Sequence, residues 1–477
     1  MVQRGKEGMQ INDILTQIND FMYTYVLIIL LVFVGVYFTI RTRGVQLRLL
    51  KDGLKSLLEK AGEDEQGKKK VSSFQALMIS TASRVGTGNI AGIATAIAAG
   101  GPGAVVWMWL MAVIGGASAF IESTLAQIYK VKEGGEFRGG PSYYMERALG
   151  KRSLGVLFSV LLIICFAYGF NGLQSFNMSS ALEYYIPNYS DSMYPMLVGV
   201  ILAVATGLVI WGGVHRIGFI SSVIVPIMAT AYILIGIVTM LMHAGEIPHV
   251  FTVIMKNAFD FQAIAGGLAG SAVVIGIKRG LFSNEAGMGS APNASASADV
   301  EHPVKQGLVQ AISVFIDTLL ICSSTAMMLL VSGVEGKAGV LDGIPYVQQA
   351  ISSNVGQWGI HFITFSIFAF AFSSLIGNYY YAESNIRFIK NDKKVLFVFR
   401  ITCVVAIFLG AQADFSLIWN LADITMGCMA IVNIIAIFLL RNIACKALCN
   451  YEEQKKAGKK PVFKAADIGL YNTDVWK

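Results

Sequence analysis

The chain has 477 residues, of which 55% are hydrophobic and only 14% are charged, and its mean hydropathy is +0.60. Soluble domains carry about 25% charged residues, so this composition excludes an ordinary water-soluble protein and requires lipid to cover much of the surface. The net charge of +7 does not indicate a nucleic-acid-binding protein. The basic residues lie between apolar runs, where they are typical of the cytoplasmic face of a membrane protein.

Apolar runs long enough to cross a bilayer, which takes about 20 residues, recur along the whole chain. They predict an all-α membrane protein with about eleven transmembrane helices, near 23–41, 72–99, 103–129, 153–182, 193–212, 216–242, 262–296, 304–332, 358–385, 394–410 and 413–441.

Positive charge is concentrated in alternate connections between these runs. The segment 41–71, which includes Lys68 and Lys69, is strongly basic, and so are 130–152, 387–394 and the tail beyond 441, whereas 183–193 contains no lysine or arginine. Basic connections face the cytoplasm. With eleven spans this pattern predicts a multi-pass protein of the cell (inner) membrane, with its N-terminus outside and its C-terminus in the cytoplasm.

The stretch from Gly44 to Lys60 has the pattern of an amphipathic helix. Leu47, Leu50, Leu54, Leu57 and Leu58 share one face, which favours a helix lying on the inner membrane interface. An ordinary packed linker helix is the alternative interpretation.

The cysteine and histidine residues do not indicate a disulfide-bonded or zinc-binding protein. Six cysteines show no framework of extracellular pairs, and five scattered histidines form no zinc motif. We therefore expect no structural disulfide and no cofactor beyond a coupling ion.

Two of the predicted spans are interrupted by glycine and polar residues. The second contains residues 83–92 and the seventh contains residues 280–290. Irregular backbone at membrane depth is tolerated where it lines a cavity or is buried in protein. Close helix packing is the alternative reason for such glycines, but both interruptions also contain polar residues. We call these interruptions the first break and the second break.

The two breaks lie five spans apart, which predicts a repeat. Spans two to six and seven to eleven form two sets of five with opposite topology, as in many secondary transporters. The predicted organisation is an N-terminal part over 1–71 with one extra helix and the linker, a first repeat over 72–242, a second repeat over 243–441 and a cytoplasmic tail over 442–477.

Several longer motifs resemble one transporter family. Residues 100–109, Gly-Gly-Pro-Gly-Ala-Val-Val-Trp-Met-Trp, are similar to the signature of the sodium:alanine symporter family, with Val106 where the family usually has phenylalanine. Residues 86–92, 140–145 and 283–292 also look like family motifs. The resemblance spans about residues 23–441. It implies a leucine-transporter-type fold and import of alanine or glycine with Na⁺, with membrane lipid around the protein and no nucleic-acid partner.

The resemblance and the physics of helix ends together suggest a substrate site. Free backbone N–H groups at a broken helix attract an anionic group. We expect the substrate carboxylate at Thr87, Gly88 and Asn89 in the first break. The remaining wall would come from Phe282, Ser283 and Asn284 in the second break and from Phe170 and Gln174, which share a helix face. A helix–helix hydrogen bond is the alternative role for Gln174.

A Na⁺ site should be built from oxygen atoms. By analogy with the common sodium site of this fold, we expect the carbonyls of Ala82 and Val85 with the hydroxyls of Ser373 and Ser374. The alternative is that these serines bond only to their own helix.

Charged residues inside the spans are costly and are usually functional. Arg84 adjoins the first break, and we expect it to form a gate pair with Glu285, Asp317 or Glu122. Glu285 could instead form a local salt bridge with Lys278 or Arg279. If one of these acids exchanges a proton, the coupling ion is H⁺ rather than Na⁺.

Other function classes fit the sequence less well. The chain contains no G-x-x-x-x-G-K-[ST] motif for ATP. A channel would favour repeated pore segments and rings of charge. An intramembrane enzyme would need a histidine near Ser83 or Ser283, and none lies within a few residues in sequence. We therefore predict a transporter and not an enzyme.

Overall fold

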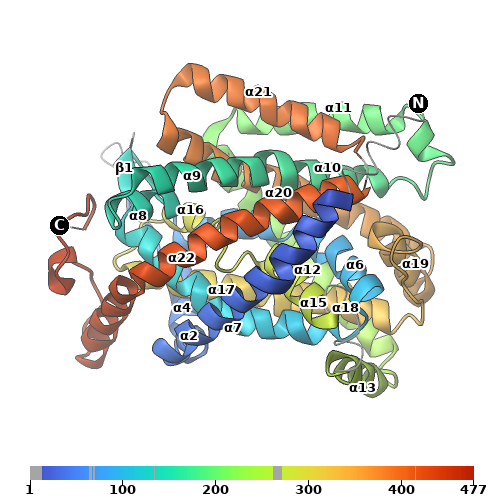
Figure 1. Cartoon of the computed structure of the whole chain (residues 1–477), viewed down its shortest axis with the longest axis horizontal. Coiled ribbons are helices and arrows are strands. Elements are labelled where there is room, and N and C mark those ends of the chain that lie inside the picture. Colours follow the sequence, from blue (N-terminus) through green and yellow to red (C-terminus); the bar gives the residue numbers. More distant parts are fainter. Residues whose placement is uncertain are drawn as a thin grey trace.

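The computed structural model describes residues 13–63, 67, 70–133, 135–260, 271–413 and 415–476. Lys68, Lys69, the start of the predicted seventh span (262–270) and residues 1–12 lie outside these described residues. The described chain is mostly helical, which confirms the predicted class, and its helices form one elongated bundle (Figure 1).

The elements of the N-terminal part and the first repeat are η1 (Met22–Leu27), α2 (Ile28–Arg41), α3 (Val45–Arg48), α4 (Leu50–Leu57), α5 (Ser73–Arg84), η2 (Thr87–Asn89), α6 (Ala91–Gly100), α7 (Ala104–Ile128), β1 (Val131–Glu133), β2 (Glu136–Arg138), α8 (Pro141–Arg147), α9 (Arg152–Leu162), η3 (Ile163–Phe170), α10 (Asn171–Ser180), η4 (Tyr189–Asp191), α11 (Tyr194–Ile210) and α12 (Gly213–Met242).

The elements of the second repeat and the tail are α13 (Ile247–Ala258), α15 (Ala272–Asn284), α16 (Pro292–Ser295), α17 (Pro303–Phe315), η6 (Ile316–Cys322), α18 (Ser323–Leu330), α19 (Gly343–Val355), α20 (Trp358–Ile389), α21 (Lys393–Gly410), α22 (Phe415–Lys456) and η7 (Ala465–Ile468).

Helices lie at each of the eleven predicted positions within the described residues. Among the described residues, seven continuous helices are long and apolar enough to span a membrane. The two broken helices fall short of that length because each is divided into two pieces. The chain is therefore a multi-pass membrane protein.

Four regions that the sequence predicts as connections or tail are more structured than expected. The segments 243–261 and 333–357 contain α13 and α19, and the connection 130–152 contains a small antiparallel hairpin in which Val131 pairs with Arg138. Helix α22 continues from the predicted end at 441 to Lys456, and the segment after it folds back. These regions are polar or short, so hydropathy does not reveal them.

The predicted amphipathic linker is helical over α3 and α4, and most of its predicted leucine face is exposed, although Leu57 is partly buried. Leu47, Leu54 and Leu58 are exposed, while Gly53 lies against Leu308 and Ile312 of α17. An apolar outer face beside a packed inner face suits a helix at the membrane interface.

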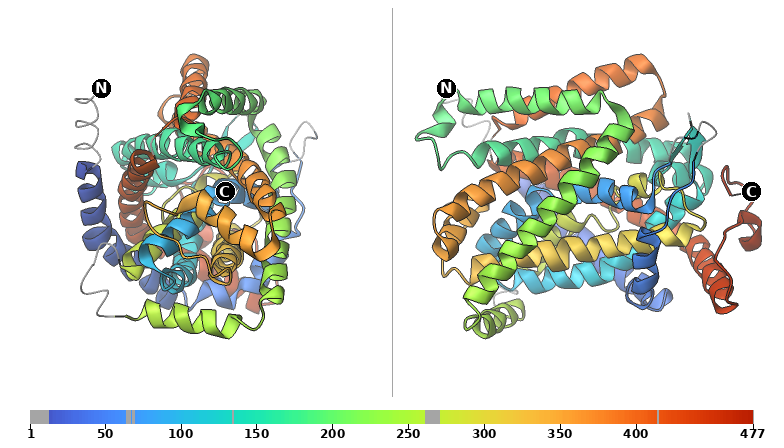
Figure 2. Two further views of the ribbon diagram at one scale, coloured as in Figure 1. Left: turned by 90° about the vertical axis from the view of Figure 1, so that its right-hand side faces the viewer. Right: turned by 180° about the vertical axis from the view of Figure 1, so that it is seen from behind.

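The two broken helices occupy the middle of the bundle. Helix α5 contacts α12, α17 and α20, and α15 contacts α6 and α7. Helices α11 and α21 pack side by side along one face, outside this centre (Figures 1 and 2). The polar breaks are thereby shielded from lipid on all sides, as irregular backbone at membrane depth requires.

The hairpin, α8 and the C-terminal segment lie at one end of the bundle (Figures 1 and 2), and several basic residues lie in or next to these elements. We call this end, marked by Lys130, Arg138, Arg147, Lys305 and Arg387, the basic end. Helix α19 lies at the opposite end.

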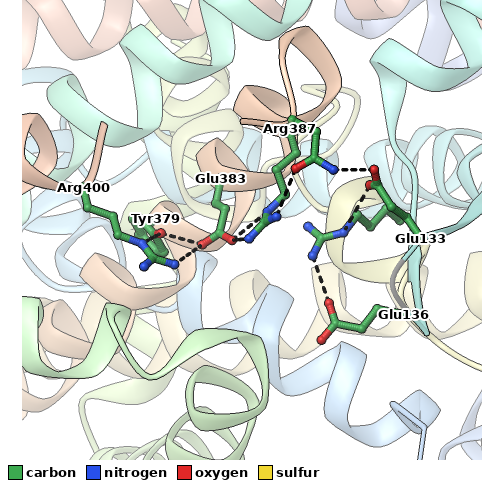
Figure 3. A network of polar contacts seen from close by, with 8 residues as sticks. Glu133, Glu136, Tyr379, Glu383, Arg387 and Arg400 are labelled. Carbon is green, nitrogen blue, oxygen red and sulfur yellow. Dashed lines mark hydrogen bonds and ion pairs between the residues drawn. The ribbon is translucent and has the colours of Figure 1, made fainter. Parts of the chain in front are cut away.

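An ionic network at the basic end joins the hairpin to α20 and α21 (Figure 3). Glu383 is buried and lies 2.6 Å from Arg387 and 3.8 Å from Arg400. Arg400 donates to the Tyr379 hydroxyl over 2.9 Å. The chain of contacts continues through Asn391 to Glu133 and Arg138. The network fixes the end of α20, the helix that supplies Ser374.

Replacing Glu383 with alanine should destabilise the protein by about 3 kcal/mol, because it removes a buried carboxylate and leaves two partly buried guanidinium groups without their shared partner. Glu136→Ala is the matched control. Its carboxylate also pairs with an arginine, over 2.9 Å, but is about one-third exposed, so we expect less than about 1 kcal/mol. Thermal unfolding in detergent measures both changes. Equal effects of the two variants would contradict the structural role of the network.

Candidate functional site

The first break begins where α5 ends at Arg84. The helix starts with a capping box, in which Ser72 and Gln75 satisfy each other's backbone N–H groups. Val85 leaves the helical conformation, Gly86 is extended, and Thr87–Asn89 form one tight turn before α6. A side chain at Gly86 would lie 2.4 Å from the Ser374 hydroxyl, so the backbone approaches α20 as closely as glycine allows.

Neighbouring amide side chains satisfy the free N–H groups of the first break. The Thr87 N–H donates to the Gln174 amide oxygen over 3.0 Å, and the Gly86 N–H donates to the Asn89 side chain over 3.1 Å. Asn177 donates to the Thr87 hydroxyl over 3.0 Å. Gln174 therefore contacts one of the N–H groups predicted for the substrate carboxylate. Its amide oxygen is a neutral acceptor that a carboxylate could replace.

The carbonyl oxygens before the first break converge on one serine. The Ser374 hydroxyl lies 2.9 Å from the Ala82 carbonyl, 3.2 Å from that of Ser83 and 3.5 Å from that of Val85. The Ser373 hydroxyl instead donates to Phe370 of its own helix over 2.8 Å. Of the two predicted serines, the structure joins Ser374 to the oxygen cluster, while Ser373 follows the alternative interpretation.

The irregular backbone of the second break begins at Glu285, which ends α15 by adopting a left-handed conformation with φ of 54°. This conformation costs a non-glycine residue about 1–2 kcal/mol. The Glu285 carboxylate lies 3.0 Å from the Ser83 hydroxyl of α5 and 2.5 Å from the Ser290 hydroxyl. These contacts hold the strained residue in place and tie the second break to the helix that precedes the first.

Glu122 of α7 binds the backbone of the second break from the opposite side. Its carboxylate accepts from the N–H groups of Gly287 and Gly289 over 3.2 and 3.1 Å, and from the Asn433 amide over 2.8 Å. All three partners are donors, which suits an ionised carboxylate. Glu122 was predicted as a gate partner of Arg84, but its contacts here are with the break itself.

Asp317 brings the two breaks together. Its carboxylate lies 2.7 Å from the Asn89 amide of the first break, 2.6 Å from the Ser283 hydroxyl of the second, and 3.0 Å from Thr318. Asn89 also donates to Ser283 over 3.1 Å. Three residues predicted separately thus form one buried cluster. Asn284, by contrast, caps the Ala286 N–H over 3.0 Å and supports the break instead.

Arg84 is buried, and its guanidinium makes no hydrogen bond or ion pair with the part of the chain that the structure describes. The gate pair expected for it is therefore not formed in this conformation. Glu122, Glu285 and Asp317 are close enough to interact with it electrostatically. Each of these acids is held by neutral donors.

The salt bridge considered between Glu285 and Lys278 or Arg279 is not present among the described residues. Asp423 of α22 accepts both cations, with Lys278 at 2.7 Å and Arg279 at 3.1 Å. Asp423 was not among the predicted site residues. Its signal was available, because it is an acidic residue inside an apolar span.

Aromatic rings close one side of the site. Phe170 and Phe282 are both buried, and their ring centroids lie 4.8 Å apart. The ring centroid of Phe166 lies 4.8 Å from that of Phe170 in a tilted arrangement, and that of Trp419 lies 5.2 Å from that of Phe282. Phe166 and Trp419 were not predicted, because nothing in an apolar span distinguishes a ring facing a site from one facing lipid.

Gly88 packs directly under one of these rings, and this contact is testable. A methyl group added to Gly88 would lie 2.5 Å from Cε1 of Phe282, so Gly88→Ala must displace the ring or the break. We expect transport to fall at least tenfold, because a displacement of about 1 Å at a binding site can cost about 100-fold. Transport assays in proteoliposomes measure the loss.

Gly92→Ala is the matched control for this substitution. Gly92 lies in α6 one turn further on, and its added methyl group would meet Trp419 at an ordinary 3.7 Å. We expect near-normal transport. A normal rate in Gly88→Ala, or an equal loss in both variants, would contradict the close approach of the two breaks.

The chain is similar to known transporters over almost its whole length. The chain is 45% identical to the amino-acid carrier protein AlsT of Bacillus subtilis over 98% of each chain. It is 49% identical to the probable sodium/glutamine symporter GlnT of the same organism, over 93% of this chain and 91% of the other. It is 36% identical to the sodium/alanine symporter AgcS of Methanococcus maripaludis, over 93% and 98%.

Solved structures confirm the predicted fold. MhsT in complex with L-phenylalanine matches 79% of this chain and 89% of its own, with a TM-score of 0.55 at 12% identity. A manganese transporter mutant from Eremococcus coleocola matches 84% and 81%, with a TM-score of 0.54 at 13% identity. The family model of the sodium:alanine symporters matches residues 8–465. The chain therefore belongs to the sodium:alanine symporter family, whose members are membrane transporters and not enzymes.

Proposed function

We propose that the protein imports alanine and glycine together with Na⁺ by alternating access, with the substrate bound between the two breaks. The observation that carries this proposal is the meeting of both breaks at one buried polar cluster. Asn89 and Ser283, one from each break, lie 3.1 Å apart and both contact Asp317. A ligand held there touches both repeats, so movement of one repeat against the other transfers access from one side to the other.

The first break supplies the binding groups for an amino acid. Thr87, Gly88 and Asn89 lie just before the N-terminus of α6. The positive end of the helix dipole and the free N–H groups there favour the substrate carboxylate. Gln174 accepts from Thr87 over 3.0 Å in this conformation; we propose that its amide turns to bond the substrate when the carboxylate arrives. The substrate ammonium group then lies toward Ser283 and Asn284 of the second break.

The arrangement of the aromatic rings favours a substrate with a small side chain. Phe170 and Phe282 are separated by 4.8 Å between centroids, and Gly88 lies against Phe282 with no room for a methyl group. A substrate that fits beside these rings has little side-chain volume, as alanine and glycine do.

We place Na⁺ at the oxygen cluster of Ala82, Val85 and Ser374. The carbonyls and the hydroxyl are hard neutral oxygen ligands of the kind that hard cations prefer, and they lie within 3.5 Å of the Ser374 oxygen. The Ser83 carbonyl is a further ligand candidate at 3.2 Å. Ser373 is the weaker part of this proposal, because its hydroxyl bonds within α20.

A proton-coupled symporter of the same fold is the second candidate. Asp317 and Glu285 each bridge to a break through hydroxyl or amide donors and have no cationic partner within ion-pair distance in the described residues. Either acid could gain a proton during the cycle. Arg84, which stands free of these acids, would then act as a gate in the opposite conformation.

We also propose the predicted orientation. The basic end would face the cytoplasm, since positive residues are retained on that side, and the end that carries α19 would face outward. Protease protection of intact cells tests this directly, because cleavage after Lys455 or Lys459 from outside would contradict it.

The central experiment is uptake of radiolabelled alanine by the reconstituted protein. Inward Na⁺, a pH gradient alone and no gradient are compared, with glycine and glutamine as competitors. Accumulation that requires Na⁺ and is blocked by glycine supports the proposal. Accumulation under the pH gradient alone would indicate that transport is coupled to H⁺, with Asp317 or Glu285 as the group that exchanges the proton. Transport of glutamine in preference to alanine would contradict the proposed substrates, alanine and glycine.

Ser374→Ala should raise the Na⁺ concentration for half-maximal alanine uptake at least tenfold, because it removes an oxygen at the centre of the carbonyl cluster. Ser373→Ala is the matched control, one residue away in the same helix, and should change this concentration less than threefold. The Na⁺ dependence of initial uptake rates measures both. Equal effects would contradict the placement of Na⁺ at Ser374.

A further inference from the structure

The C-terminal segment folds back on the basic end of the bundle after α22 ends at Lys456. Residues 457–476 carry three large apolar side chains that are almost fully covered: Phe463, Ile468 and Trp476. Trp476, the last described residue, is only 7% exposed. A free polar tail would not bury its aromatic residues, so this segment is part of the folded structure.

Trp476 docks beside the end of α7. Its indole N–H donates to the Gln127 carbonyl over 2.7 Å, and its ring lies 4.9 Å from the Lys130 ammonium group. Arg147 pairs with Asp474 over 2.6 Å, and its carbonyl accepts from Asn472 over 3.0 Å. Figure 1 shows the segment beside β1 and α8.

Gln127 and Lys130 in turn hold the chain that follows the second break. Lys130 donates to the Ala298 carbonyl over 2.8 Å, and the Gln127 amide lies 2.5 Å from the Ser295 carbonyl and 3.0 Å from that of Ala298. We call residues 295–302 the exit strand. Trp476 thus contacts the same two residues that fasten the exit strand to α7.

The other half of the C-terminal segment contacts the exit strand itself. The Phe463 N–H donates to the Glu301 carbonyl over 2.9 Å, and Lys460 pairs with the Glu301 carboxylate over 2.5 Å. The Phe463 ring packs on His302 at 5.1 Å. Burial lowers the pKa of His302 to about 4, so its ring is neutral near pH 7 and suited to this apolar contact.

The exit strand also fastens the start of the first broken helix. The Asp299 N–H donates to the Val71 carbonyl over 2.9 Å, and its carboxylate accepts from the Gly62 N–H over 3.0 Å and lies 3.6 Å from Lys70. Opening the pathway at the basic end requires α5 or the exit strand to move away. Either movement must break contacts that the C-terminal segment reinforces.

We propose that the C-terminal segment is a latch that holds the basic end closed through Trp476 and Phe463. The latch goes beyond the transport proposal: it rests on the alternating-access mechanism but not on the identity of the substrate or the coupling ion. Weakening it increases the fraction of protein that is open at the basic end.

Hydrogen–deuterium exchange of the full-length protein in detergent tests the latch without any transported substrate. In Trp476→Ala we expect amide exchange in peptides covering 72–84 and 292–302 to rise at least fivefold over the wild type. Tyr471→Ala is the matched control, because Tyr471 belongs to the same segment but is 87% exposed. It should leave both peptides unchanged.

Unchanged exchange in a folded Trp476→Ala protein would overturn the latch, and so would an equal rise in Tyr471→Ala. If Trp476→Ala lowers the yield of folded protein, Phe463→Ala tests the other half of the segment and must raise exchange in the 292–302 peptide. Failure of alanine uptake in the wild type would remove the proposed substrate but would not affect these results.

Transport gives a second, pH-dependent readout. Burial lowers the pKa of Lys130 to about 7, with Asp299 opposing and Lys70 adding to the shift. When the latch opens and water reaches Lys130, its pKa returns toward about 10.4. Opening therefore takes up a proton between pH 7 and about pH 10, and the latch strengthens as the pH rises through that window.

In oriented proteoliposomes, raising the internal pH from 7 to 8 should make opening about fivefold less favourable. A larger outward-facing fraction binds external alanine more tightly, so the KM for uptake should fall. Lys130→Met, which keeps the length of the side chain but cannot titrate, should abolish this dependence. The same pH dependence in Lys130→Met would overturn the assignment of this effect to Lys130.

Discussion

The structure depends on one constraint, the need to pair backbone polar groups that two broken helices leave free at membrane depth. Water cannot reach these groups, and an unpaired buried N–H or C=O costs several kcal/mol. In the first break, neutral side chains pair with these backbone groups. Gln174 and Asn89 accept hydrogen bonds from N–H groups, and the Ser374 hydroxyl contacts the carbonyls. In the second break, the carboxylate of Glu122 binds two N–H groups at once.

This difference between the breaks explains which of them can exchange partners. A neutral amide such as that of Gln174 is held weakly and can give way to a substrate carboxylate or a cation. Glu122 accepts three hydrogen bonds and is fully buried, so removing it would leave several donors unpaired. The first break is therefore suited to transient ligands, and the second serves as the fixed wall against which they bind.

The parts of the fold that were predictable are those that leave a signal in hydropathy. Glycine and polar residues inside long apolar runs revealed both breaks, and their spacing revealed the repeat. The role of Glu122 left no such signal, because its partners exist only after Gly287 and Gly289 adopt left-handed conformations. The C-terminal segment was missed for another reason. Its apolar residues are single and widely spaced, and they are buried only by contact with distant connections.

The same reasoning links the size of the substrate site to residues far from it. Phe282, which limits the space beside Gly88, belongs to the last turn of α15, in the helical part of the second break. Its ring contacts Trp419, whose own ring lies 4.3 Å from the Arg279 guanidinium that Asp423 binds. Glu122 on one side and Asp423 on the other thus fix the wall that we propose limits the size of the substrate. A change of substrate within this fold can therefore arise from residues that fasten the break as well as from residues that touch the substrate.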